Sequence, residues 1–190
     1  MGKKYELIPS DKEGLYRVKA LKDFNDVKNG DIGGYIQSEN NLSQYGDCWI
    51  YDNAVVIGKA IVCDNARVHN NAQVCDNAIV RDNVQVWDNA QIYGNAYLHD
   101  NAKVSGNARI WGNADVSGDA IISSDKDYIV FKNWWSSGRY FTWTRSNNMW
   151  KVGCLYGTGE ELIAKAYKDS EEKGREYENI VRYVEIVNNF

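Results

Sequence analysis

A six-residue repeat constrains this chain more than any other feature. An aliphatic residue recurs at every sixth position from Ile50 to Ile122 without a gap. Four positions after each one, from Ala54 to Ala120, stands a small residue, which is alanine everywhere except at Val84. Asp, Gly or Asn, followed almost always by Asn, fills the space between them. Because these residues turn tightly or tolerate left-handed backbone, each hexad predicts a short strand followed by a corner.

Three such hexads predict one triangular coil whose strands pair with the coils above and below at a spacing of about 4.8 Å. A period of six fits neither the alternation of an ordinary amphipathic strand nor the 3.6-residue period of a helix. Four earlier residues keep the same phase: Ile32, Ile36, Leu42 and Cys48. We therefore predict a parallel β-helix of about five coils over residues 32–124, with aliphatic and alanine side chains inside.

The repeat resembles the hexapeptide-repeat left-handed β-helix family, which includes many acyltransferases. Left-handedness is implied by this resemblance, since parallel crossovers are otherwise right-handed. Two further segments flank the repeat: Gly-Gly-Tyr-Ile at 33–36 and Asn-Asn-Met-Trp-Lys-Val-Gly-Cys-Leu-Tyr-Gly-Thr at 147–158. With them the chain resembles uncharacterised hexapeptide proteins of bacteriophage and prophage genomes. That resemblance implies a phage accessory protein and supplies no catalytic residue.

The two ends of the chain leave the repeat. Residues 1–31 contain strand-like runs at Lys4–Ile8 and Leu15–Leu21, which predict an N-terminal β cap over the open first coil. Residues 125–190 predict a small C-terminal β–α domain. Its expected strands are Tyr128–Phe131, Tyr140–Thr144 and Met149–Tyr156. Thr158 and Glu161 form a capping box for a first helix, and Gly174 precedes a second one. The fold class predicted is thus mainly β.

Outward positions of the coils carry apolar side chains in columns. One column contains Ile57, Cys75, Tyr93 and Trp111. Exposed apolar columns indicate a face covered by another molecule, and proteins of the resembled family are commonly trimers. We therefore expect a homotrimer with this column at the interface. The alternative is that these side chains simply stack along the sheet as cross-strand neighbours.

Enzymatic activity has weak support in the residues. Hexapeptide acyltransferases typically use a histidine base at a subunit junction, and the chain has only His69 and His99. Five hexads separate these two residues, so they lie on different faces and cannot form one catalytic or two-histidine metal site within one chain. No hexad between Ile50 and Ile122 is interrupted by a loop that would shape an acceptor pocket. We expect no metal and no cofactor, and we keep an acyltransferase with an inter-subunit histidine as the alternative function.

Charge separates the body from the C-terminal part. Residues 31–125 carry 12 acidic and 5 basic side chains, whereas residues 126–151 carry 1 acidic and 5 basic ones. An acidic body disfavours binding of duplex nucleic acid along the coils. Aromatic side chains interleaved with cations suit stacked bases or nucleotides, although small domains also bury tryptophans as core. The candidate binding residues are Trp134, Trp135, Arg139, Trp143, Arg145, Trp150 and Lys151.

These observations predict a non-enzymatic oligomeric binding protein. It would bind or sequester a host protein or a nucleotide-like signal, and a phage setting would make this an anti-defence role. No apolar run approaches 18 residues, and the four cysteines form no Cys-x-x-Cys pair. We therefore expect a cytoplasmic protein that does not engage a membrane.

Overall fold

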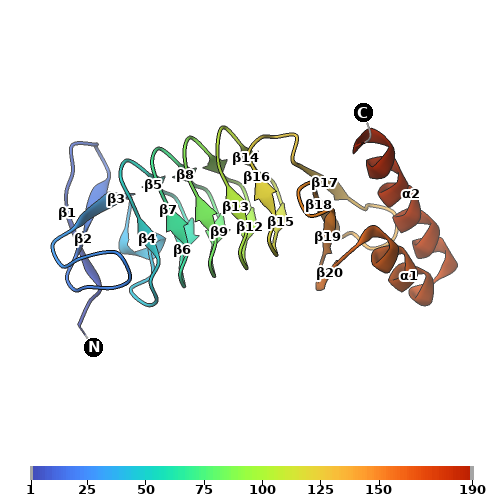
Figure 1. The fold of residues 1–190 in the computed structure, drawn as a ribbon, viewed down its shortest axis with the longest axis horizontal. Helices are drawn as coiled ribbons and strands as arrows, with labels where there is room; N and C mark the ends of the chain where they lie inside the picture. Colours follow the sequence, from blue (N-terminus) through green and yellow to red (C-terminus); the bar gives the residue numbers. More distant parts are fainter. Residues whose placement is uncertain (1, 189–190) are drawn as a thin grey trace.

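The computed structural model describes residues 2–188, which form an elongated solenoid closed by antiparallel strands at each end (Figure 1). The repeat region consists of two-residue strands joined by tight corners. These strands are β4 (Trp49–Ile50), β5 (Val55–Val56), β6 (Ile61–Val62), β7 (Arg67–Val68), β8 (Gln73–Val74), β9 (Ile79–Val80), β10 (Gln85–Val86), β11 (Gln91–Ile92), β12 (Tyr97–Leu98), β13 (Lys103–Val104), β14 (Arg109–Ile110), β15 (Asp115–Val116) and β16 (Ile121–Ile122).

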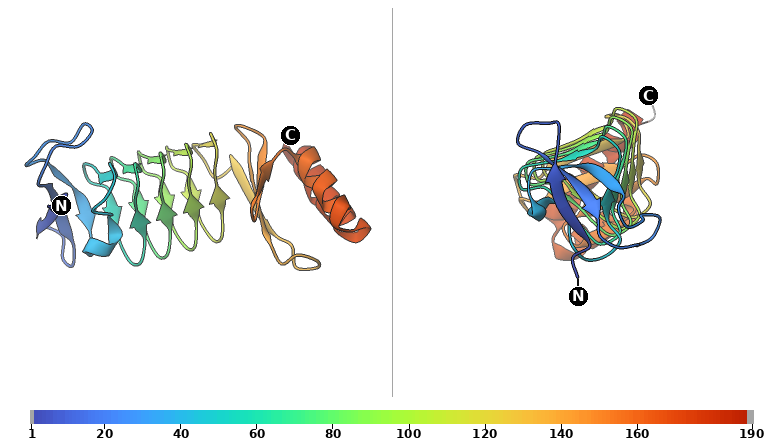
Figure 2. Two further views of the ribbon diagram at one scale, coloured as in Figure 1. Left: turned by 90° about the horizontal axis from the view of Figure 1, so that it is seen from below. Right: turned by 90° about the vertical axis from the view of Figure 1, so that its left-hand side faces the viewer.

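Every third strand of the repeat joins the same parallel sheet, which makes three faces. The sheets run β5-β8-β11-β14, β4-β7-β10-β13-β16 and β6-β9-β12-β15. Val86 in β10, for example, pairs with Val68 in β7 and with Val104 in β13. Seen along the long axis, successive coils lie over one another (Figure 2). The prediction of a mainly β solenoid of about five coils is confirmed, and the left-handed coil stays a prediction.

The corners have the backbone geometry that the repeat predicts. The third residue of the hexads has a positive φ, such as 54° at Asp82 and 60° at Asp100. The carboxylate of Asp82 also stabilises the equivalent corner of the following coil, because the N–H of Asp100 donates to Oδ2 of Asp82 at 3.1 Å. Asp, Gly or Asn occupies this position in every hexad, since these residues tolerate the left-handed region. The aspartates of the corners are therefore required by the turn.

The interior of the solenoid is a column of buried aliphatic side chains. The repeat aliphatics from Ile50 to Ile122 are fully buried, and so are the alanines between them. Ile36, Leu42 and Cys48 continue this column toward the N-terminus. The phase predicted for Ile32 is wrong, because Ile32 is 57% exposed. At that residue the chain still pairs antiparallel with the cap, opposite Lys19, and it enters the coil only at Ile36.

An antiparallel cap closes the first coil. Strands β1 (Tyr5–Pro9), β2 (Tyr16–Ala20) and β3 (Ile32–Ile36) extend the first of the three sheets, and the short 3₁₀ helix η1 (Glu39–Asn41) follows. Buried Lys4 donates to the carbonyl oxygens of Cys48 at 2.9 Å and Gly46 at 3.2 Å. Burial lowers the pKa of Lys4. In the other coils such carbonyl groups accept from backbone N–H groups of the preceding coil. Lys4 supplies the donor at the first coil, which no coil precedes.

The C-terminal part is a four-stranded antiparallel sheet covered by two helices on the side away from the solenoid (Figures 1 and 2). Its elements are β17 (Tyr128–Lys132), β18 (Tyr140–Thr144), β19 (Met149–Val152), β20 (Leu155–Gly157), α1 (Gly159–Asp169) and α2 (Glu171–Asn188). A second hydrophobic cluster fills the space between this sheet and the helices. The predicted division into 1–31, 32–124 and 125–190 stays a prediction.

Two local expectations at this end are wrong and one is confirmed. The run Met149–Tyr156 is two strands, because a turn at Gly153, with φ of 58°, folds β20 back on β19. Gly174 lies inside α2, where it packs so closely against Tyr167 that a side chain would collide with the ring. The capping box of α1 is present, with Thr158 and Glu161 each accepting the other's backbone N–H.

Candidate functional site

The C-terminal part caps the last coil with side-chain oxygens. In each preceding coil a strand N–H donates to a backbone carbonyl of the coil that follows it in the chain. The N–H of Gln91, for example, donates to the carbonyl of Ala108 at 2.9 Å. Beyond the last coil there is no next carbonyl, and three side chains substitute for it. Asp125 accepts from the N–H of Arg109 at 2.8 Å, Thr142 from Asp115 at 2.9 Å and Ser146 from Ile121 at 2.7 Å.

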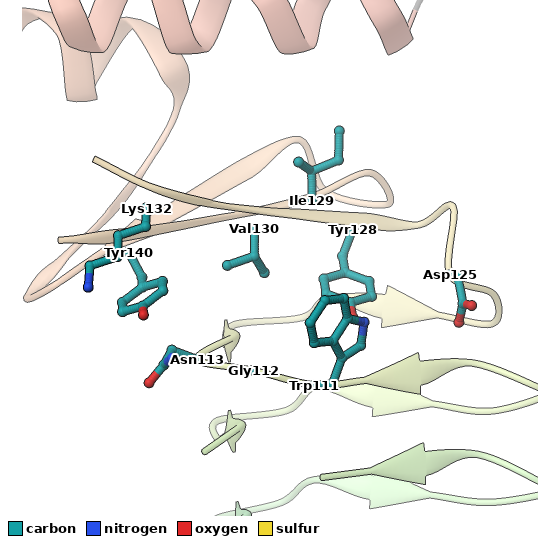
Figure 3. Close-up of a pocket in the computed structure, with 9 residues that line it drawn as sticks. All are labelled: Trp111, Gly112, Asn113, Asp125, Tyr128, Ile129, Val130, Lys132 and Tyr140. Carbon is teal, nitrogen blue, oxygen red and sulfur yellow. The ribbon is translucent and has the colours of Figure 1, made fainter. Parts of the chain in front are cut away.

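A groove lies between the last coil and this capping sheet (Figure 3). Its volume is about 510 Å³, which is within the usual range of small-molecule sites. The floor is the corner after β14, and the opposite wall is one side of β17 with a residue of β18. Its lining residues are Trp111, Gly112, Asn113, Asp125, Tyr128, Ile129, Val130, Lys132 and Tyr140.

Alternation along β17 produces the apolar wall of the groove. Tyr128 and Val130 face the solenoid, whereas Ile129 points toward the helices (Figure 3). The Tyr128 hydroxyl donates to the carbonyl oxygen of Arg109 at 2.8 Å, and burial raises the pKa of Tyr128 to about 12. Trp111 lies opposite and is 59% exposed. The ring of Tyr128 is therefore fixed, whereas that of Trp111 presents an open face.

Lys132 provides the positive charge of the groove. Its ammonium lies 3.7 Å from the centre of the Trp134 ring and 5.2 Å from that of Tyr140. Within residues 2–188 it forms no ion pair. The other charged residue of the lining, Asp125, is neutralised by Arg109, whose hydrogen bond lowers the pKa of that carboxyl. A cation held by aromatic faces and lacking a carboxylate partner attracts an anion.

Two of the four tryptophans predicted to bind ligand lie in the second core. Trp143 and Trp150 are 1% and 2% exposed and stand opposite each other on β18 and β19. The indole of Trp143 donates to Oδ1 of Asn148 at 2.9 Å. Both rings are almost fully buried, and their positions match the alternative in which they are core residues.

The other predicted binding residues do not form one site. Trp134 and Trp135 lie in the β17–β18 loop and are 71% and 80% exposed. Trp134 does not line the groove itself, but its ring contacts the ammonium of the groove residue Lys132. Arg139 and Arg145 are exposed, and Lys151 is half-buried on β19. Arg139 lines a separate depression of about 170 Å³ beside Cys154 and α1. The seven predicted residues are thus divided between a core, a loop and the surface.

The predicted interface column is only partly open. Ile57, Cys75 and Tyr93 are half-buried, and Trp111 alone is well exposed. Trp111 is also a groove residue, which gives its exposed face a second explanation. The homotrimer stays a prediction.

The two histidines follow strands of different sheets and have different environments. His69 follows β7 and stacks on Tyr51 with ring centres 4.1 Å apart. Burial lowers the pKa of His69. Its imidazole forms no hydrogen bond within the described residues, and its stacking on Tyr51 is the aromatic contact that holds it.

His99 follows β12 and bridges two carboxylates. Nε2 lies 2.9 Å from Asp115 and Nδ1 lies 3.2 Å from Asp100. Burial opposes the charged form, but the hydrogen bond and charge of Asp115, together with Asp100, outweigh it and raise the pKa of His99. Both ring nitrogens are therefore engaged, which leaves none to accept a proton from a substrate.

Asp82, His99 and Asp100 also come close enough to hold a metal ion, with their ligand atoms within 4.8 Å of one another. The carboxylate of Asp100 already accepts from the N–H of Gly118 at 2.9 Å and from His99. Asp82 accepts from the N–H of Asp100 and pairs with Arg81. Corner hydrogen bonds and the ion pair account for this cluster.

The family match lies within the repeat. A family model described as the YdcK beta solenoid repeat matches residues 50–64 and 72–87. The chain is a β-solenoid repeat protein. It is also similar to a protein named uncharacterized acetyltransferase YdcK from Escherichia coli (strain K12), with 49% identity over 49 residues. That match covers 25% of this chain and only 15% of the relative.

The matched family segments end before the groove begins at Trp111. The groove is thus built from residues outside the segments that carry the family resemblance. Neither helix within residues 2–188 has the length and apolar character needed to span a bilayer.

Sequence reasoning missed most of the groove. The sequence indicates Trp111 only as an interface residue, and Lys132 is only one of the five basic residues in 126–151. Asn113 has the same sequence context as other corner asparagines, and Tyr140 meets Lys132 only because β17 and β18 pair in one register. The signal that was available is the loss of the repeat after Ile122, which marks where a coil end must be covered.

Proposed function

We propose that this protein is a non-enzymatic binding protein whose groove takes a small nucleotide-like ligand, with a planar ring and an anionic group. The observation that carries the proposal is the juxtaposition of the exposed Trp111 face with the Lys132 ammonium in one cavity of about 510 Å³. Stacking of a base on an aromatic ring contributes roughly 1–3 kcal/mol and tolerates different bases. Lys132 supplies a positive charge for the anionic group of the ligand. No ion pair of Lys132 within residues 2–188 has to be broken when the ligand binds.

Direct binding measurements test this proposal. Isothermal titration calorimetry and tryptophan emission would be recorded with AMP, GMP, UMP, cyclic AMP and coenzyme A. We expect at least one to bind saturably, and Trp111→Ala and Lys132→Gln each to weaken it about tenfold or more, because each removes one of the two recognition elements.

A surface variant separates the groove from the exposed loop. Arg139→Glu combined with Arg145→Glu reverses two exposed charges that do not line the groove, so it should leave binding within about threefold after allowance for screening. Loss of binding in this double variant, with Trp111→Ala unaffected, would instead favour the loop and surface cations. Failure of every nucleotide to bind would contradict the proposal.

Acyl transfer is the second candidate, and the similarity to a protein named as an acetyltransferase is the observation that favours it. His69 is the residue to test, since its imidazole forms no hydrogen bond within residues 2–188. Transfer of an acetyl group from acetyl coenzyme A to amine or hydroxyl acceptors, lost in His69→Ala, would replace a purely binding role by catalysis.

The wider setting is part of the same proposal. A trimeric phage-encoded protein that binds a nucleotide-like signal would lower the free concentration of that signal in the host cytoplasm. It would thereby act against the defence of the host. Light scattering at micromolar concentration tests the trimer. Pull-down from host lysate tests the other predicted partner, a host protein.

A further inference from the structure

Rows of asparagine amides run along the corners of the solenoid. In one row Nδ2 of Asn77 donates to Oδ1 of Asn95 at 3.1 Å, and Nδ2 of Asn95 donates to Oδ1 of Asn113 at 3.5 Å. All bonds of the row point the same way, so each amide polarises the next one. The row therefore presents a donor, Nδ2 of Asn113, at its C-terminal end.

The backbone at this corner ends in the same direction. The N–H of Asn77 donates to the carbonyl of Gly94 at 2.9 Å, and that of Asn95 donates to Gly112 at 2.7 Å. Asn113 occupies the same position in the last coil, so its N–H points to where another coil would lie. Within residues 2–188 neither this N–H nor Nδ2 of Asn113 has an acceptor.

What lies beyond Asn113 is the groove. Asn77 and Asn95 are exposed, whereas Asn113 is half-buried beneath the capping sheet. Its side chain lies on the floor, with Tyr140 and Lys132 on the opposite wall (Figure 3). Elsewhere the C-terminal part supplies side-chain oxygens to three last-coil N–H groups, at Arg109, Asp115 and Ile121. It supplies none at Asn113.

We infer that Asn113 is the oxyanion-recognition residue of the groove, and that a carboxylate or phosphate oxygen of the ligand takes the place of the missing coil's oxygens. Two donors from one residue and a nearby ammonium form a cradle suited to a group with several acceptor oxygens. This inference deepens the proposed function and rests on it for the aromatic part of the ligand.

A charge variant with a matched control tests the assignment. Asn113→Asp keeps an oxygen that accepts from Asn95 but removes the terminal donor and adds a negative charge. Asn107→Asp makes the same change at the exposed end of a second row, in which Asn89 donates to Asn107 at 3.4 Å. We expect Asn113→Asp to weaken AMP binding at least about tenfold and adenosine binding less than about twofold. Asn107→Asp should change neither, and unaltered AMP affinity in Asn113→Asp would overturn the inference.

Amide chemical shifts provide a readout that needs no nucleotide. In ¹⁵N-labelled protein titrated with inorganic phosphate or with acetate, the backbone and side-chain amides of Asn113 should shift saturably while those of Asn107 do not. The ion with the larger response identifies phosphate or carboxylate as the natural group. If neither ion shifts Asn113 the inference is wrong, even if nucleotides bind. If phosphate shifts Asn113 but no nucleotide binds, the proposed function fails and the oxyanion site stands.

Discussion

The solenoid and the C-terminal part are stabilised by different kinds of core. Along the solenoid, nearly identical aliphatic side chains stack on copies of themselves in the neighbouring coils, as Val86 does on Val68 and Val104. The C-terminal core instead brings unlike, large rings together, and Phe141 lies 4.6 Å from Tyr177 and 6.4 Å from Trp150, measured between ring centres. A repeated core spreads stability over many equivalent contacts, whereas the aromatic core depends on a few specific ones.

The largest effect should come from a charge placed inside the repeat. Val86→Asp buries a carboxylate in a column that contains no polar partner, so we expect a loss of at least roughly 5 kcal/mol and failure to fold. Circular dichroism and urea denaturation measure it. Gln85→Asp is the control, because Gln85 is exposed between Arg67 and Lys103, and should change stability by less than about 0.5 kcal/mol. Similar melting of the two variants would contradict the inward and outward assignment.

Removing one ring from the aromatic core should sharpen the comparison. Trp150→Ala leaves a large cavity between the sheet and helix α2, so we expect a cost of about 3–5 kcal/mol confined to the C-terminal part. Hydrogen exchange should show protection lost after residue 125 and retained in the coils. Trp135→Ala, at an exposed position, should have an effect below about 0.5 kcal/mol. Equal loss of protection in the coils would mean that the two cores unfold as one unit.

The junction between the two regions should give an intermediate effect. Thr142→Val keeps the shape of a buried side chain but removes the oxygen that accepts from the N–H of Asp115, which should cost about 1–3 kcal/mol. Ser146→Ala removes the corresponding oxygen for Ile121 at an exposed position, where water replaces it, and should cost less than about 1 kcal/mol. Denaturant midpoints of both variants give the comparison, and a larger loss in Ser146→Ala would contradict it.

The smallest effect should be a pH dependence near the last coils. Since the pKa of His99 is raised in the folded state, its charged form stabilises the fold. That contribution is complete below the unfolded value of about 6.5 and is lost as pH rises through the folded pKa. His69, whose pKa is lowered, acts in the opposite sense, so its contribution is lost as pH falls below about 6.5.

Single variants resolve these two histidines. His99→Gln should lower stability at pH 6 by up to about 1 kcal/mol and should have less effect at pH 8.5. His69→Gln should flatten the dependence on the acidic side. Urea denaturation across this range measures both, and an effect of His99→Gln that grows with pH would show that the sign is wrong.

Much of the architecture could be predicted from the sequence, because each hexad repeats the same evidence for an inward aliphatic residue and a corner. All the other hexads support the inward position of Val86. Corner residues such as Asp82 have a positive φ, which few other side chains tolerate. At the ends each residue occurs once. Met149–Tyr156 therefore looked like one strand, and Gly174 looked like a helix boundary.

The candidate site shows the same limit more strongly. Strand β18 lies between the solenoid and the helices, and Phe141, Thr142, Trp143 and Thr144 are all buried. Alternation along such a strand does not reveal which side chains meet solvent, because neither face does. Only the packing on each face shows that Trp143 is a core residue while Trp134, in the preceding loop, is exposed.

By itself, the sequence determined the solenoid, its corners and its inward side chains, because an 18-residue spacing of strands needs only local turns and identical neighbours. The tertiary structure alone decided how the last coil is covered, because the residues that cover it occur once and follow no repeat. Asn113 differs from Asn95 in nothing that its hexad reveals. It becomes a candidate recognition residue because β17 leaves the repeat and passes over it without supplying the oxygen that the next coil would have carried.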